Sequence, residues 1–120
     1  MSTLIVMLNS TKKGINMKAI TKNTYEQDVV KSNKIVLLDV WAPWCAPCRG
    51  MNPIIEALSE EVKDWAEVVK LDASVEMDLV QELGVSGLPT FLIYKNGQIV
   101  DSIVGATSKD SLLKALTKAS

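Results

Sequence analysis

Histidine is absent from this sequence: none occurs among 120 residues. Catalytic triads and dyads that use an imidazole, and His-ligated metal sites, are therefore excluded. Cysteine is almost as scarce, with two residues, so one chain cannot supply the four thiolates of a Cys₄ metal site. The chemistry of this protein must then come from carboxylates, lysines or the two cysteines.

Net charge and long apolar runs are also missing. The formal charge is −1, from 13 Lys and Arg against 14 Asp and Glu, which offers no electrostatic footprint for nucleic acid or an anionic membrane. The apolar run nearest the N-terminus, residues 4–8, is shorter than the core of a signal peptide and far shorter than a membrane span. We therefore expect a cytoplasmic protein with no nucleic-acid or membrane partner.

The apolar residues that are present predict alternating strands and helices. Residues 34–41 are almost continuously apolar, which is typical of a strand buried on both faces. Apolar residues at every third or fourth position predict a helix over 51–63, which Pro53 should kink. Asn96-Gly97 predicts the turn of an antiparallel hairpin. The other expected elements are strands at 17–20, 67–71, 90–94 and 98–104 and helices at 24–32, 77–83 and 107–119, the last capped at Thr107.

This order of elements predicts an α/β fold with a single central sheet. The alternation in the first half implies right-handed parallel crossovers, and the closing hairpin adds antiparallel strands. We expect a mixed sheet of about five strands, in the order β-α-β-α-β-α-β-β-α, with helices on both faces. A length of 120 residues fits one such domain.

The two cysteines lie together in Cys45-Ala46-Pro47-Cys48, between the buried strand and the kinked helix. The free N–H groups and the dipole at a helix N-terminus favour a thiolate at Cys45. Two intervening residues allow the sulfurs to bond across the first turn, where Pro47 costs no intrahelical hydrogen bond. A redox-active dithiol is the favoured interpretation. The alternatives are a fixed disulfide, half of a metal or iron–sulfur site shared between chains, and a pair of unreactive thiols.

The segment from Trp41 to Arg49, WAPWCAPCR, resembles the active site of the thioredoxin family, with Ala46 where the common motif has glycine. Further matches are Pro53, the Gly87-Leu88-Pro89-Thr90 loop, and residues 95–97 and 104–106. The resemblance extends from about Met17 to the C-terminus. It implies a thioredoxin domain at 17–120, preceded by an N-terminal extension at 1–16 that is a candidate disordered segment.

The resemblance implies a thiol–disulfide oxidoreductase that reduces protein disulfides through a reversible Cys45–Cys48 cycle, with no metal and no other cofactor. Cys45 would attack the substrate, and Cys48 would resolve the mixed disulfide. The Leu88–Pro89 bond would be cis. The implied substrate groove comprises Trp44, Ala46, Pro47, Gly87, Leu88, Pro89, Val104, Gly105 and Ala106.

The implied partners are disulfide-containing proteins and an NADPH-dependent thioredoxin reductase, with the chain acting as a monomer. Two other functions compete with this interpretation. One is a binding module or structural subunit with the same fold, and the other is an oxidase or isomerase of an oxidising compartment. Because no histidine lies between the cysteines, we expect a reducing protein with a potential close to about −270 mV. Ala73 stands where relatives often carry Ile or Val, which should make that groove wall shallower.

Two charged residues complete the predicted site. Asp39 interrupts a run of Val and Leu, so it should be buried with a raised pKa, and it is then the available proton acceptor for Cys48. The resemblance places the family's buried aspartate here. Lys70 matches the family lysine that lies near this aspartate. The alternatives are an aspartate at a strand end turned toward water and an ordinary solvent-exposed lysine.

Overall fold

A four-stranded mixed sheet forms the centre of the computed structural model, which describes residues 17–120. The predicted extension at 1–16 lies outside the described residues. Strand β1 (Ile35–Trp41) pairs in parallel with β2 (Ala66–Asp72) and antiparallel with β3 (Thr90–Lys95). β3 continues through a hairpin into β4 (Gln98–Val104), giving the order β2-β1-β3-β4. The predicted mixed α/β sheet is confirmed.

The fifth strand that we expected at residues 17–20 is reduced to one parallel bridge, between Ala19 and Lys70. Ile20 N–H donates to the Lys70 carbonyl at 2.7 Å, and Lys70 N–H donates to the Lys18 carbonyl at 3.0 Å. The chain then turns away, because Thr21 N–H bonds the hydroxyl of Thr24 at 2.9 Å. This local side-chain bond ends the pairing that the apolar pattern predicted.

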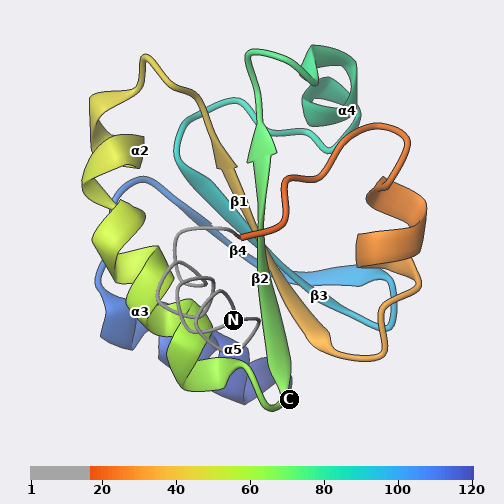
Figure 1. The fold of residues 1–120 in the computed structure, drawn as a ribbon, viewed down its shortest axis with the longest axis vertical. Coiled ribbons are helices and arrows are strands. Elements are labelled where there is room, and N and C mark those ends of the chain that lie inside the picture. Colours follow the sequence, from red (N-terminus) through yellow and green to blue (C-terminus); the bar gives the residue numbers. More distant parts are fainter. Residues whose placement is uncertain (1–16) are drawn as a thin grey trace, which may run out of the picture.

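Helices cover both faces of the sheet, as Figure 1 shows. On one face, Ile35 and Leu37 pack with α3 (Asn52–Val62) and α5 (Lys109–Ala119). On the other, the alternate β1 residues Val36, Leu38 and Val40 pack with η1 (Glu26–Val30) and α4 (Met77–Glu82). Burial of both sets explains the continuous apolar run of β1. Asp39, next in the series of Ile35 and Leu37, belongs to the face that α3 covers.

Two predicted helices differ from the structure in detail. The helix predicted at 24–32 is present as the π-helix η1. The cap predicted at Thr107 is wrong by one residue: Ser108 has the extended backbone of an N-cap, and its hydroxyl accepts from Ser111 N–H at 3.1 Å. Because Ser and Thr both cap helices well, the pattern alone could not separate the two positions.

The predicted kink is a break between two helices. α2 (Ala46–Gly50) ends at Gly50, Met51 caps it, and α3 begins at Asn52. Pro53 lies in the first turn of α3, and it has no N–H with which to continue the ladder from α2. Met51 is buried in the core on the α3 side, so the break is fixed by packing as well.

The predicted Asn-Gly hairpin turn is confirmed. Asn96 and Gly97 have φ values of 52° and 80°, as the favoured two-residue turn requires. A Cβ atom at residue 97 would also lie 2.7 Å from the Val30 carbonyl oxygen, so glycine is needed there. No helix within residues 17–120 is long and apolar enough to cross a membrane.

Candidate active site

The two cysteines are joined by a disulfide where β1 passes into α2. Cys45 is the N-cap of α2, with an extended backbone, and Cys48 lies inside the helix, with a Cα–Cα distance of 5.3 Å. Cys48 N–H donates to Cys45 Sγ at 3.4 Å, so a helix-terminal N–H group is aimed at that sulfur. Pro47 occupies the first turn, as its ring geometry favours.

The two sulfurs have different surroundings. Both residues are buried and pack with Ala42, half-buried Trp41 and Leu88. Of the two cysteines, Cys45 lines the neighbouring cavity and Cys48 does not, and 7% of Cys45 is exposed against 2% of Cys48. An incoming group therefore meets Cys45 first.

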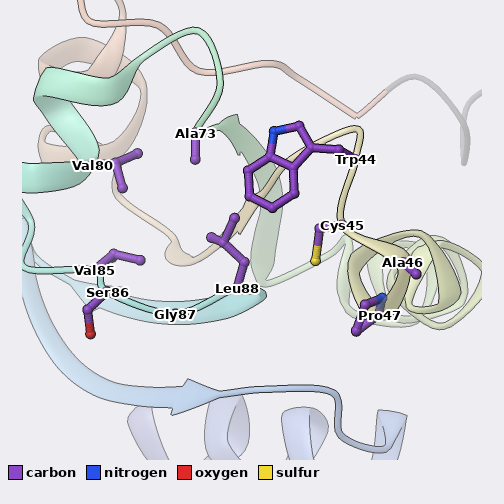
Figure 2. Close-up of a pocket in the computed structure, with 10 residues that line it drawn as sticks. All are labelled: Trp44, Cys45, Ala46, Pro47, Ala73, Val80, Val85, Ser86, Gly87 and Leu88. Carbon is purple, nitrogen blue, oxygen red and sulfur yellow. The ribbon is translucent and has the colours of Figure 1, made fainter.

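A cavity of about 560 Å³ opens beside Cys45 (Figure 2). Trp44, a member of the predicted groove, stands over one side with 71% of its surface exposed. Figure 2 shows Ala73 on the wall between Trp44 and Val80, where its methyl group leaves room that a larger side chain would fill. The complete lining is Trp44, Cys45, Ala46, Pro47, Ala73, Val80, Val85, Ser86, Gly87 and Leu88.

Five of the predicted groove residues line this cavity, and four lie next to it. Pro89 and residues 104–106 do not line it, although Gly105 N–H donates to the Pro89 carbonyl at 2.7 Å and so joins the two segments. Sequence reasoning missed Val80, Val85 and Ser86, which α4 and the following loop bring to the wall. The apolar character of Val80 and Val85 could not distinguish groove wall from core, and Ser86 is an ordinary loop residue in the sequence.

The loop before β3 presents its backbone to the cavity. The Leu88–Pro89 peptide bond is cis, as expected. Thr90, almost fully buried, donates its hydroxyl to the Gly87 carbonyl at 2.6 Å and ties the loop. Among residues 17–120, no hydrogen bond uses the backbone of Leu88. Its N–H and C=O groups are therefore available to an extended chain lying in the groove.

Asp39 is buried, as predicted, with 2% of its surface exposed. Its Oδ2 lies 3.9 Å from Lys70 Nζ, and its Oδ1 has no hydrogen-bond partner among the described residues. Burial raises the pKa of Asp39 from 3.8 to about 6, because removal from water outweighs the attraction of Lys70. A carboxyl in this state exchanges protons close to neutral pH.

Lys70 is not a solvent-exposed lysine: 15% of its side chain is exposed. Its ammonium donates to Asn52 Oδ1 at 2.9 Å and lies 4.6 Å from the centre of the Trp41 ring. The register of β1 and β2 places it opposite Asp39. Sequence reasoning anticipated Asp39 as its neighbour and missed Asn52, which the sequence presents as an ordinary polar residue of an amphipathic helix.

Comparison with known proteins identifies the family to which this chain belongs. The family model described as thioredoxin matches residues 16–118. The chain belongs to the thioredoxin family. It is 38% identical over 100 residues to thioredoxin 1 of Synechococcus elongatus, covering 83% of this chain and 94% of that protein. It is 35% identical over 111 residues to a bifunctional thioredoxin reductase/thioredoxin of Mycobacterium leprae, covering 92% of this chain and 24% of that protein.

Solved structures agree with the family. Mitochondrial thioredoxin 3 of Saccharomyces cerevisiae, in its oxidized form, superimposes with a TM-score of 0.79 at 30% identity, covering 88% of this chain and 97% of that chain. As a thioredoxin-family protein with a disulfide-forming CxxC pair, the chain is a thiol–disulfide oxidoreductase. Thioredoxins use their own cysteine pair for this chemistry. Within residues 17–120, no three His, Cys, Asp or Glu side chains are grouped to hold a metal ion.

Proposed function

We propose that this chain reduces disulfides of other proteins, with Cys45 as the attacking thiolate and Cys48 as the resolving thiol. The observation that carries this proposal is the unequal exposure of the two cysteines, since Cys45 lines the cavity whereas Cys48 does not and is 2% exposed. Attack by Cys45 breaks the substrate disulfide, forms a mixed disulfide and releases one substrate thiolate. Cys48 then attacks Cys45, the Cys45–Cys48 bond forms, and the second substrate thiolate leaves and takes up a proton.

Asp39 is the proposed acceptor for the proton of Cys48. A thiol must lose its proton before it can attack, and a carboxylate with a pKa of about 6 is mostly ionised at pH 7 while still a useful base. Support comes from the buried position of Asp39 on the sheet face that α3 covers. Lys70 is proposed to moderate its proton affinity through their 3.9 Å ion pair.

The substrate is proposed to lie in an extended conformation along the cavity. Exposed Trp44 and the Ala46-Pro47 turn would contact its side chains, and the free backbone groups of Leu88 would pair with its main chain. Gly87, Pro89 and the Val104-Gly105-Ala106 segment would support that pairing. The mostly apolar lining and the net charge of −1 favour recognition by shape and backbone over long-range attraction.

For the return to the dithiol state, we propose an NADPH-dependent thioredoxin reductase as the electron donor. The fused reductase and thioredoxin of the Mycobacterium leprae relative supports this choice. We also propose that the chain acts as a monomer in the cytoplasm, where a reducing environment suits two closely spaced cysteines. A coupled assay with NADPH and a thioredoxin reductase measures the recharging directly.

The experiment that tests the cysteine roles is covalent trapping. With Cys48→Ser the mixed disulfide cannot be resolved, so incubation with oxidised insulin should give an adduct at Cys45 that mass spectrometry detects and dithiothreitol releases. The matched variant Cys45→Ser should give little adduct. Comparable adducts from the two variants, or none from Cys48→Ser, would contradict the assignment.

A further inference from the structure

Lys70 directs its hydrogen bond at Asn52 and not at Asp39. Its ammonium donates to Asn52 Oδ1 at 2.9 Å, whereas Asp39 Oδ2 lies at 3.9 Å, beyond hydrogen-bond distance. The Trp41 ring, with its centre 4.6 Å from the ammonium, provides a third contact. A neutral amide thus holds the cation, and the carboxylate receives only its longer-range attraction.

Apart from its contact with Lys70, Asn52 makes no side-chain hydrogen bond among the described residues. It is the first residue of α3, half-buried, and asparagine is a poor helix former that is favoured at helix starts because it can cap them. Here the N-cap position belongs to Met51, and no side chain caps the helix. Among the described residues, Asn52 Oδ1 accepts one hydrogen bond, and its donor is Lys70, 18 residues further along the chain.

We propose that Asn52 is a positioning residue, which fixes the Lys70 ammonium away from Asp39 and so keeps that carboxylate basic enough to accept the proton of Cys48. The inference rests on the proposed function, in which Asp39 takes this proton as the Cys45–Cys48 bond forms. A carboxylate in a close ion pair would be a weaker base. One with no cation nearby would have a higher pKa and would keep its proton to a higher pH.

Among residues 17–120, Lys70 is the one charged group that pairs with Asp39. Asp72 on β2 accepts hydrogen bonds from the backbone and side chain of Ser74, and Arg49 on α2 donates to the Pro43 carbonyl. Glu56, one turn beyond Asn52 on α3, makes no ion pair within residues 17–120, and the β3 partner of Asp39 is Phe91. The two cysteines do not titrate while they are joined.

The test is a pH titration of the Asp39 carboxyl carbon by NMR in the oxidised protein, assigned with Asp39→Asn. Because both thiols are in the disulfide and no substrate is present, this readout is independent of turnover. In Asn52→Ala the freed ammonium should move toward Asp39. If the distance from Lys70 Nζ to Asp39 Oδ2 shortens by about 1 Å, the proton affinity of Asp39 should fall roughly tenfold at an effective dielectric constant of about 20. The midpoint of the Asp39 titration should therefore move to lower pH. In Asn52→Asp, the new carboxylate should hold the Lys70 ammonium more firmly and add a second negative charge near Asp39. Both effects should raise the midpoint of the Asp39 titration.

Two controls separate positioning from general disturbance. In a Lys70→Met background, Asn52→Ala should leave the Asp39 midpoint unchanged, because no cation is left to move. Asn33→Ala, an exposed amide ahead of β1, should not move it either. The proposal is overturned if Asn52→Ala leaves the midpoint where it was or raises it, or if its effect persists without Lys70. The trapping experiment above can fail without affecting this result, so the two inferences are distinguishable.

Discussion

Replacing Asp39 by asparagine is expected to stabilise the oxidised protein at neutral pH. In the native state the pKa of Asp39 is raised to about 6 from an ordinary value of 3.8, because burial penalises its charge more than Lys70 relieves it. At pH values above about 7 the folded protein carries this penalty in full, because Asp39 is then ionised in the folded state too. Below 3.8 the carboxyl is protonated in both folded and unfolded states, so the penalty disappears.

The magnitude follows from the difference in proton affinity. A gap between 3.8 and about 6 corresponds to about 3 kcal/mol of unfolding free energy. The amide that replaces the carboxyl is neutral at every pH, so the variant escapes the penalty. The free energy gained relative to wild type should therefore be largest above pH 7, decline steeply between pH 6 and 4, and approach zero below pH 3.8. A gain of about 3 kcal/mol corresponds to a rise in Tm of roughly 10 °C for a domain of this size.

Urea unfolding of the oxidised wild type and Asp39→Asn, from pH 4 to 8 at constant ionic strength, measures this difference. The extra N–H donors of the amide shift the difference by an amount independent of pH, so its pH dependence isolates the ionisation of Asp39. Asp64→Asn, in the exposed turn between α3 and β2, is the matched control and should follow the wild-type profile. A difference between Asp39→Asn and wild type that stays flat from pH 4 to 8 would refute the reasoning.

Two further predictions concern the groove and the core. Ala73→Ile should fill the cavity wall between Trp44 and Val80 and raise KM roughly tenfold for protein disulfides flanked by bulky apolar residues, with reduction of a small aromatic disulfide as the control. Equal KM values of wild type and Ala73→Ile for these protein disulfides would refute this. Tyr25→Phe should cost about 1–3 kcal/mol in urea unfolding, more than Tyr94→Phe, because it leaves the buried Tyr94 hydroxyl without its 2.8 Å partner. The reverse order would contradict it.

Strong periodic signals explain why much of the fold was predictable. The continuous apolar run of β1, the Asn-Gly turn and the spacing of Ile55, Leu58 and Val62 each follow from one local rule of packing or backbone geometry. The predictions were weakest where two residues could do the same work. The helix cap at Ser108 and the single bridge at Ala19 depend on which of several local hydrogen bonds forms.

Some features of the candidate site could be predicted from the sequence, and others could not. Burial of Asp39 and exposure of Trp44 could be anticipated, because one charge in an apolar strand and one indole beside a helix start are visible in the sequence. The contact between Asn52 and Lys70 could not, since it joins residues on separate elements through a single hydrogen bond. Val80 belongs at once to the core and to the groove wall, and only its position relative to Cys45 distinguishes the two.

The central property proposed for this protein is the reduction of protein disulfides by the Cys45–Cys48 pair. Reduction of insulin by dithiothreitol, followed as turbidity, tests it directly when wild type is compared with Cys45→Ser at equal concentration. We predict that wild type accelerates the reaction well beyond dithiothreitol alone, and that Cys45→Ser returns it to the uncatalysed rate. Wild type no faster than dithiothreitol alone, or Cys45→Ser as fast as wild type, would contradict the account.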